Sequence, residues 1–458
     1  MGETPRHIWP EHSKLPRSEL FHTYLKDTPL QRLSRLRVPF SVPRELLAEH
    51  TAIFAPAGHG KTQLLQALVH DLLADNPPAM IIMDSHGDML RNLRPIIPPE
   101  KLVVLDPEVS PPALNLFDLE GTASDEMFGY LFTAIDRTLT AKQLTAVIFA
   151  LRLLKKLPTP TLVTFLEVLG DRAKNIEGSK YRSIIEAFDP ITHGFFATQY
   201  FDKDNSGTRT QVANRLFSVL GNPIFEKMFN APTNSFDAFK CMQEGKIVLV
   251  NTSMLALRTQ GSSVLGRYVI AQCLSAAYKR ATLLEHQRRP ALIIIDEAAQ
   301  YFDDTTETIL SESRKYNVGL MFATQYVGQL PDEVRQSMAG NTATKIVGPV
   351  SMQDARYLAH EMGTSPEFIR SMKKTERHAE FAAYVRNRIN TALRVEVPFG
   401  VVPTQKEDRS TGIAELVPEV ARSARSFDIR GNTPADYDAM SDDFDPAQPT
   451  AWKDGDEV

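Results

Sequence analysis

The feature that most constrains this chain is residues 55–62, which read A-P-A-G-H-G-K-T. The apolar run 51–55 precedes the glycines, and the apolar residues of 63–69 follow them at helical spacing. A strand, a Gly-rich turn and a helix in this order are typical of a phosphate-binding loop, where backbone N–H groups and a helix N-terminus converge on phosphate oxygens. Ala55 stands where the pattern usually has its first glycine. The segment predicts a nucleoside triphosphate site.

The residue types within this loop suggest individual roles. Lys61 is expected to reach the β- and γ-phosphates, and the Thr62 hydroxyl is expected to ligate Mg²⁺. The alternative is a Gly-rich turn that holds no ligand. The residues expected to contact the nucleotide are Pro56, Ala57, Gly58, His59, Gly60, Lys61, Thr62 and Gln63.

A second motif is the acidic pair that ends the segment 291–297, A-L-I-I-I-D-E. A strand this apolar is expected to be buried, which puts Asp296 and Glu297 at the sheet edge where open α/β folds bind ligands. There Asp296 would hold Mg²⁺ and Glu297 would accept the proton of an attacking water. Such pairs also occur by chance, so this prediction depends on the phosphate loop. The absence of a guanine-reading N-K-x-D segment favours ATP.

A third candidate is Gln325, which follows the apolar run 318–323. If this run is a parallel strand, Gln325 lies at the same edge as the acidic pair and its amide would contact the γ-phosphate or the attacking water. Arg314, just before the run, is a candidate to act on the ATP of a neighbouring subunit, because a guanidinium stabilises transition-state charge. The alternatives are an ordinary strand-end amide and a solvated helix-end arginine.

Composition limits the classes of protein that remain. The chain has 458 residues, 43% hydrophobic and 23% charged, which is enough for two or three globular domains. Two cysteines are too few for a disulfide scaffold or a Cys-rich zinc site and fit a reducing cytosol. No apolar run reaches 18 residues, so no transmembrane span is expected, and the N-terminus lacks the apolar core of a signal peptide. The net charge of −5 combines −7 from residues 404–458 with +2 from the remainder.

Several short apolar runs bounded by turns or helices predict an α/β fold with a mostly parallel sheet. Between the third and fourth runs lies a long, mostly helical segment, which we interpret as an all-α domain inserted between strands. The expected organisation is an N-terminal arm at 1–45, the sheet domain at 46–120 and 244–402, the all-α insertion at 121–243 and an acidic, disordered tail at 403–458.

Three other groups of residues allow more than one reading. Asp84, His86 and Asp88 suggest a metal site but fit a structural turn better. The aromatic cluster of the insertion suggests base stacking but fits packing better. The basic residues around 203–215 suggest phosphate contacts, and a solvated face is the simpler interpretation. These groups are, for the aromatic cluster, Phe195, Phe196, Tyr200 and Phe201 and, for the basic group, Lys203, Arg209 and Arg215.

The segment 314–325, R-K-Y-N-V-G-L-M-F-A-T-Q, resembles the type IV secretion coupling proteins and their relatives in the FtsK–HerA superfamily. G-N-T-A-T-K-I at 340–346 and V-S-M-Q-D-A-R-Y-L at 350–358 continue the resemblance. Upstream, I-M-D-S-H-G-D at 82–88, V-L-D-P at 104–107, N-L-F at 115–117 and G-K-I-V-L-V-N at 245–251 match in order and spacing. The resemblance extends over about residues 46–400, and the ordered set is far more specific than any one motif.

This resemblance implies a RecA-like P-loop NTPase core with an inserted all-α domain, assembled as a homo-hexamer that moves DNA without regard to its sequence. It implies ATP and Mg²⁺ as cofactors, Lys61 and Thr62 on phosphate and metal, Gln325 as sensor and Arg314 acting in trans. Secretion-system or relaxase-type proteins would be partners. Unlike membrane-anchored coupling proteins, this chain shows no transmembrane helix, so we expect a cytoplasmic protein recruited to the inner membrane by partners. The alternatives are a protein-handling or secretion-assembly ATPase and a slow, nucleotide-switched binding module.

Overall fold

A computed structural model describes residues 38–74, 76–115, 140–302, 305–402 and 427–430, together with Leu25, Thr28, Pro29 and Phe117. Within these residues one eleven-stranded sheet has the order β1-β11-β10-β9-β8-β2-β7-β6-β3-β5-β4. The strands are β1 Val38–Phe40, β2 Thr51–Phe54, β3 Ala79–Asp84, β4 Leu102–Leu105, β5 Ile247–Asn251, β6 Ala291–Ile295, β7 Val318–Thr324, β8 Thr344–Val347, β9 His378–Val385, β10 Leu393–Pro398 and β11 Phe427–Arg430.

Seven of the described strands, from β8 to β4 in that order, run parallel. Most of their residues are apolar because helices cover both faces of the sheet, and every residue of β6 is buried. Phe54 pairs with Thr324 and Ile295 pairs with Phe322, so the carboxyl ends of β2, β6 and β7 share one edge. The predicted α/β fold with a mostly parallel sheet is confirmed, and its register brings the three sequence motifs together.

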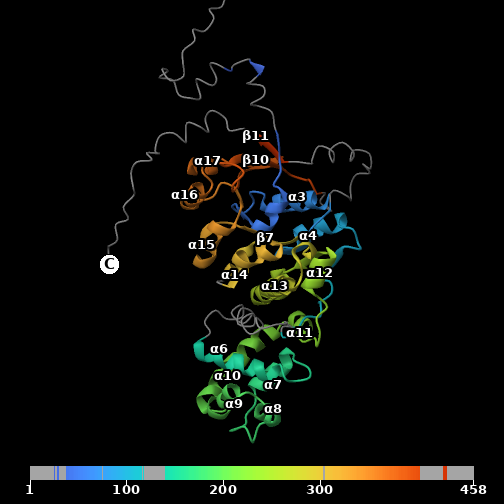
Figure 1. The fold of residues 1–458 in the computed structure, drawn as a ribbon, viewed down its shortest axis with the longest axis vertical. Coiled ribbons are helices and arrows are strands. Elements are labelled where there is room, and N and C mark those ends of the chain that lie inside the picture. Colours follow the sequence, from blue (N-terminus) through green and yellow to red (C-terminus); the bar gives the residue numbers. More distant parts are fainter. Residues whose placement is uncertain are drawn as a thin grey trace, which may run out of the picture.

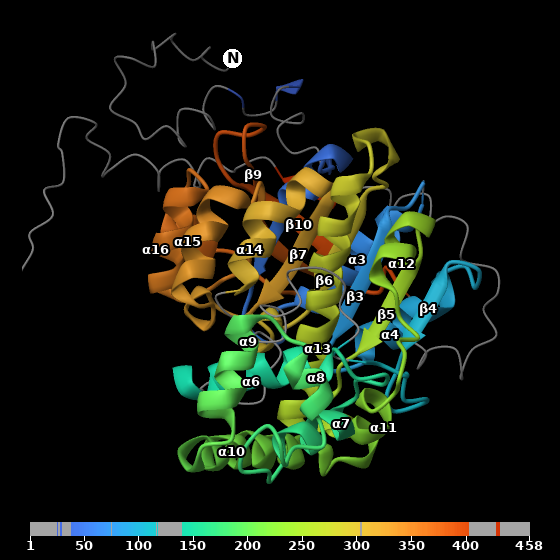
Figure 2. The same ribbon diagram turned by 60° about the horizontal axis from the view of Figure 1, so that its bottom comes forward.

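The helices cover the two faces of the sheet as separate layers (Figure 2). Leu292 and Ile294 of β6 join the core under α3 and α4, whereas Ile293 and Ile295 join the opposite core with α12 to α17. This alternation follows from the two-residue period of a strand. The helices of these layers are α3 Lys61–Leu73, α4 Asp88–Leu93, α12 Ala238–Glu244, α13 Met254–Lys279, α14 Thr305–Glu312, α15 Asp332–Asn341, α16 Met352–Glu361 and α17 Pro366–Arg370.

An antiparallel block extends the sheet beyond β8, and the sequence patterns did not predict it. β9 pairs antiparallel with β8 and β10, and β11 lies between β10 and β1. β11 falls inside 403–458, so at these four residues a strand replaces the expected disorder. The rest of that tail and most of the expected arm at 1–45 lie outside the described residues.

The inserted helices form a lobe of their own below the sheet domain (Figure 1). Residues 121–139 of the expected insertion, and residues 116 and 118–120 just before it, are outside the described residues. At its other end, α12 packs against β3 and α13, so the sheet domain resumes before residue 244. None of the described helices is long and apolar enough to cross a membrane. The helices of the lobe are α6 Ala141–Leu154, α7 Leu162–Leu169, α8 Arg182–Glu186, α9 Pro190–Phe195, α10 Lys203–Leu220 and α11 Pro223–Phe229.

Asn115 joins the segments that enter and leave this lobe. Its buried side chain donates to the carbonyls of Pro160 and Pro232 at 2.9 and 3.0 Å, and its backbone N–H donates to Asn234 Oδ1 at 2.6 Å. The bonds to Pro232 and Asn234 link positions more than 100 residues apart in the sequence. The N-L-F segment is therefore a structural anchor of the insertion.

Three of the aromatic residues of the insertion and Arg209 are structural, whereas Lys203 is exposed, as the solvated-face interpretation expected. Phe195, Phe196 and Tyr200 are buried in the lobe, as the packing interpretation expected. Arg209 is only 2% exposed, so both readings of this residue were wrong. Its Nη1 donates to the carbonyls of Leu169 and Asp171 at 3.1 and 2.7 Å, and its guanidinium lies 4.3 Å from the centre of the Tyr200 ring.

Candidate nucleotide-binding site

The phosphate loop connects the buried strand β2 to helix α3, as its sequence predicted. Its positive φ angles are at Gly58, 73°, and Gly60, 111°, where glycine is the residue that fits without strain. Ala55 has no positive φ, so this position does not require the usual glycine. Its methyl group also has room because residue 348 is glycine: a Cβ there would lie 2.8 Å from that of Ala55.

Lys61 begins helix α3 and is buried at the floor of the site. Its Nζ donates to the Ala55 carbonyl at 3.0 Å and forms an ion pair with Glu297 Oε1 at 3.3 Å. A buried ammonium needs such partners because the loss of hydration is costly. In this arrangement Lys61 neutralises Glu297, and a phosphate that enters the loop would compete for the lysine.

Asp296 and Thr62 form the second contact between the motifs. The Thr62 hydroxyl donates to Asp296 Oδ2 at 2.9 Å, and Oδ1 accepts the Glu297 N–H at 3.0 Å. Burial, with the nearby charges of Asp84 and Glu297, raises the pKa of Asp296 to about 6, although the Thr62 bond and Lys61 oppose the rise. A hydroxyl beside a buried carboxylate is an oxygen-ligand set that fits Mg²⁺.

Gln325 reaches Glu297 from the neighbouring part of the sheet edge. Its Nε2 lies 3.3 and 3.4 Å from the two carboxylate oxygens of Glu297 and donates to them. Glu297 has φ 52° and ψ 48°, an uncommon conformation for a residue other than glycine. The structure thus places Gln325, Glu297 and Lys61 in one hydrogen-bonded group, as the three sequence motifs together implied.

A cavity of about 620 Å³ lies over these residues. Most of the expected nucleotide contacts line it, but two do not. Pro56 borders a neighbouring groove, and His59 turns away from the cavity, with Nε2 2.9 Å from the Glu380 carbonyl and its ring edge-on to Phe381. The lining residues are Ala57, Gly58, Gly60, Lys61, Thr62, Gln63, His86, Glu297, Gln325, Lys374, Phe399 and Gly400.

In the turn after β3, Asp84 caps the start of helix α4. Asp84 accepts backbone N–H groups of His86, Met89 and Leu90 at 2.9 to 3.4 Å. Its carboxylate is therefore occupied in holding the turn, which agrees with the structural interpretation of this group.

Arg314 lies at the opposite edge of the sheet, before the first residue of β7. Its Nη2 donates to Glu49 Oε1 at 2.7 Å, and Glu49 is also 3.6 Å from Arg386. The seven residues of β7 separate Arg314 from Gln325, roughly 23 Å at 3.3 Å per residue. Arg314 therefore does not reach the site of its own chain.

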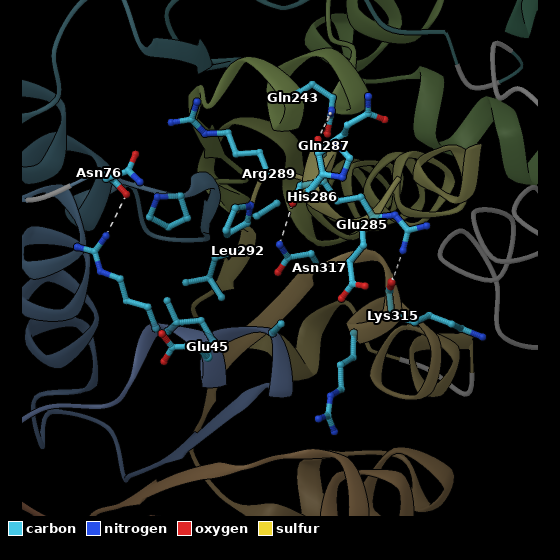
Figure 3. Close-up of a pocket in the computed structure, with 18 of the residues that line it drawn as sticks. Glu45, Asn76, Gln243, Glu285, His286, Gln287, Arg289, Leu292, Lys315 and Asn317 are labelled. Carbon is cyan, nitrogen blue, oxygen red and sulfur yellow. Dashed lines mark hydrogen bonds between the residues drawn. The ribbon is translucent and has the colours of Figure 1, made fainter. Parts of the chain in front are cut away.

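Arg314 also borders a larger cavity, of about 1090 Å³, at this opposite edge (Figure 3). Several of its polar side chains hold the backbone: Arg289 donates to the Pro77 carbonyl at 3.3 Å and Asn317 donates to the Arg288 carbonyl at 2.8 Å. This cavity contains none of the predicted nucleotide-contacting residues, so its size does not make it the nucleotide site.

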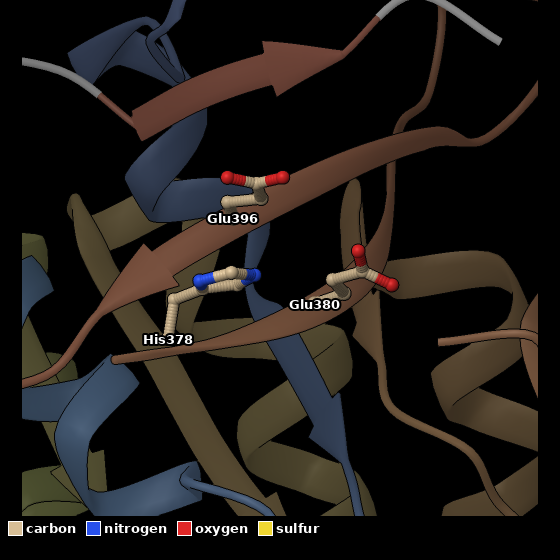
Figure 4. A group of neighbouring side chains, drawn as sticks. All are labelled: His378, Glu380 and Glu396. Atoms are coloured by element: carbon tan, nitrogen blue, oxygen red, sulfur yellow. The ribbon is translucent and has the colours of Figure 1, made fainter. Parts of the chain in front are cut away.

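Among the described residues, one group of metal-ligating type lies behind the phosphate loop (Figure 4). His378, Glu380 and Glu396 offer ligand atoms within 4.8 Å of one another, and the two glutamates are buried and directly opposite on β9 and β10. Glu380 Oε2 already accepts the Lys373 N–H at 3.0 Å and lies 3.9 Å from Arg394. These partners favour an ion-paired cluster over a metal site. The cluster fixes the position of Glu380, whose carbonyl contacts His59.

Sequence reasoning missed Lys374, Phe399 and Gly400, which line the cavity together with Gln325. They belong to the antiparallel block, and no nucleotide-binding pattern surrounds them. The alternation of 378–385 and 393–398 is a strand signal that would have located the block, but not its contact with residues more than 300 positions earlier.

Comparisons with known proteins agree with this geometry. The family model described as "Helicase HerA, central domain" matches residues 30–269, more than half of the chain. The model described as "TraM recognition site of TraD and TraG" matches residues 290–393. The curated protein described as "Probable helicase MJECL08", from Methanocaldococcus jannaschii, is 25% identical over 323 residues. That match spans 66% of this chain but only 57% of the relative's length.

Solved structures share the fold. Plasmid coupling protein TrwB in complex with ADP and Mg²⁺ gives a TM-score of 0.58 at 16% identity, over 82% of this chain and 93% of that one. VirB4 of Thermoanaerobacter pseudethanolicus gives 0.53 at 15% identity, over 78% and 91%. These likenesses, with the parallel sheet and its phosphate loop, identify a RecA-like P-loop core. From the family match over residues 30–269, the chain belongs to the helicase HerA central-domain family.

Proposed function

We propose that this protein binds and hydrolyses ATP with Mg²⁺ at the carboxyl edge of its parallel sheet. The observation that supports this most strongly is the bonded group of Lys61, Glu297 and Gln325, contributed by three separate segments of the chain. Thr62 and Asp296 are joined beside them at 2.9 Å. The complex of coupling protein TrwB with ADP and Mg²⁺, which shares the fold, is consistent with the same ligands here.

The contacts suggest a sequence of events in the site. When bound, Mg²⁺ would offset phosphate charge, and Thr62 and Asp296 would hold it. Lys61 would move from Glu297 to the β- and γ-phosphates, since phosphate oxygens carry more charge than one carboxylate. Glu297, released from the ion pair, would then accept the proton of the attacking water, while Gln325 orients it. The ion pair thus keeps the base neutralised until nucleotide arrives.

Two substitutions test these roles separately. Glu297→Gln keeps the shape of the side chain but cannot take a proton, so ATP should bind and stay unhydrolysed. Lys61→Ala should lose both binding and turnover. Glu186→Gln, in an exposed ion pair of the insertion, serves as the matched control. Phosphate release and equilibrium binding of ATPγS are the measurements. Hydrolysis by Glu297→Gln at the wild-type rate would contradict the assigned base.

We further propose that hydrolysis drives the movement of DNA in conjugation or mobile-element transfer, in a homo-hexamer and without sequence preference. The HerA family match and the coupling-protein fold support this, and the net charge of +2 over residues 1–403 does not oppose DNA binding. The match of residues 290–393 supports relaxase- or secretion-type protein partners. Arg314 is too far from its own site, so we propose that it leaves its ion pair with Glu49 to act at the site of a neighbouring subunit. Such partners would also recruit a cytoplasmic protein to the inner membrane.

DNA-stimulated ATPase activity tests this second proposal. DNA molecules of unrelated sequence should stimulate ATP turnover equally when they are compared as single strands, and equally when they are compared as duplexes. Affinity should fall with salt at a log–log slope near −0.9 per neutralised phosphate on duplex, or about −0.7 on single strands. If the assembled, ATP-hydrolysing protein shows neither stimulation nor salt-sensitive binding, the substrate is a protein instead.

A further inference from the structure

We propose that Phe399 is the platform on which the purine base stacks, and that Lys374 beside it contacts the phosphate nearest the nucleoside. The inference rests on the proposed nucleotide binding and extends it to the half of the ligand that the phosphate loop does not explain. Both residues come from the antiparallel block, outside every motif that the sequence offered.

Phe399 is held against the start of helix α3. A Cβ at Gly60 would lie 3.1 Å from Phe399 Cε1, so this glycine allows the ring to approach the phosphate loop. The next residue, Gly400, donates its N–H to Gln63 Oε1 at 3.3 Å. Phe399 itself is tied by its backbone N–H to the Arg377 carbonyl at 2.8 Å. The ring therefore has a fixed place beside Gly60, at the start of helix α3.

The space next to the ring leads away from the phosphates. Lys374 and Phe399 line the cavity over the phosphate loop and also a second, open cavity of about 620 Å³ with Thr375 and Glu376. Glu297 and Gln325, the groups for the γ-phosphate end, line the first cavity but not the second. A nucleotide with its γ-phosphate at Glu297 would thus extend its ribose and base toward Phe399.

Lys374 adds the charge that this end of the ligand needs. Its exposed side chain donates from Nζ to the Gly58 carbonyl, and Nζ lies 5.7 Å from the centre of the Phe399 ring. The ammonium is therefore positioned between loop and ring, where the phosphate attached to the ribose would pass. Together, an aromatic face and a cation at this spacing fit a nucleoside phosphate.

Stacking uses the face of a base and not its hydrogen-bonding edge, so the platform should serve ATP and GTP alike. The test uses the full-length protein and Phe399→Leu, which keeps apolar bulk against Gly60 but removes the aromatic face. Calorimetric titration with the Mg²⁺ complexes of ATPγS, GTPγS and inorganic tripolyphosphate separates base from phosphate. Phe399→Trp should restore binding, and Phe217→Leu, an exposed aromatic of the insertion, is the control.

The expected result is a loss of about 5- to 100-fold in affinity for both nucleotides, with tripolyphosphate binding unchanged. Equal weakening for all three ligands would overturn the proposal, because Phe399 would then only support the phosphate loop. Unchanged nucleotide affinity would overturn it as well. If the wild-type protein bound none of the three ligands, the proposed nucleotide function itself would fail, a result distinct from the other two.

Discussion

Replacing Asp296 by asparagine should stabilise the nucleotide-free protein while removing its response to Mg²⁺. The carboxylate is 2% exposed and buried near Asp84 and Glu297. An amide keeps the same shape and both bonds, since its oxygen can accept the Glu297 N–H and its NH₂ can donate to the Thr62 hydroxyl. What the substitution removes is the charge that burial disfavours.

The size of the effect follows from the pKa of Asp296, which rises from 3.8 to about 6 on folding. An acid whose pKa is higher in the folded than in the unfolded state lowers stability as the pH rises from 3.8 to about 6. The cost is complete above pH 6 and absent below 3.8. At about 1.4 kcal/mol for each tenfold change in the proton equilibrium, the cost at pH 7.5 is about 3 kcal/mol. The free energy of unfolding gained by Asp296→Asn should therefore approach this value at pH 7.5 and decrease as the pH falls below about 6.

Urea unfolding followed by circular dichroism between pH 4.5 and 8, with EDTA present, measures this gain. Asp202→Asn, at an exposed position of the insertion, is the matched control. Adding Mg²⁺ and ATPγS should then stabilise the wild type and leave Asp296→Asn nearly unaffected. A variant no more stable than wild type at pH 7.5, or equally more stable at every pH, would refute the reasoning.

Three further predictions concern other parts of the fold. Burial lowers the pKa of His50 from 6.5 to about 4, so the unfolded chain takes the proton first. The free energy of unfolding should fall by about 3 kcal/mol more in wild type than in His50→Gln between pH 6.5 and 4, measured by urea unfolding. Gly348→Ala should lower the free energy of unfolding by about 1–3 kcal/mol and weaken ATP binding, because the added methyl would lie 2.8 Å from Ala55 Cβ and His59 Cδ2. Combining it with Ala55→Gly should recover part of the stability and part of the ATP affinity, measured by urea unfolding and by ATPγS titration. Arg314→Ala should lower ATP turnover by about 10³-fold while ATP still binds. Mixing it with Lys61→Ala protein should restore activity if the arginine acts in trans. No recovery at any mixing ratio would exclude that role.

Short patterns predicted much of the fold and the phosphate half of the site. The short, mostly apolar runs identified the seven parallel strands, since a strand covered on both faces is apolar at most of its positions. The strand-to-loop-to-helix order located Lys61 and Thr62, and the parallel arrangement implied that Asp296, Glu297 and Gln325 share their edge. These predictions rest on local rules of backbone geometry and burial, and the residues that determine them lie within a few positions of each motif.

Other contacts between distant segments were decided only by the tertiary structure. Phe399 and Lys374 reach the phosphate loop from more than 300 residues away, and no local pattern encodes that contact. Gly348 makes room for the methyl of Ala55, a compensation visible only once β2 and β8 are neighbours. Arg209 reads as a solvated or phosphate-binding arginine but is buried against backbone carbonyls. In each case the side chain's role follows from the partners that folding supplies, and residue type and sequence spacing do not specify those partners.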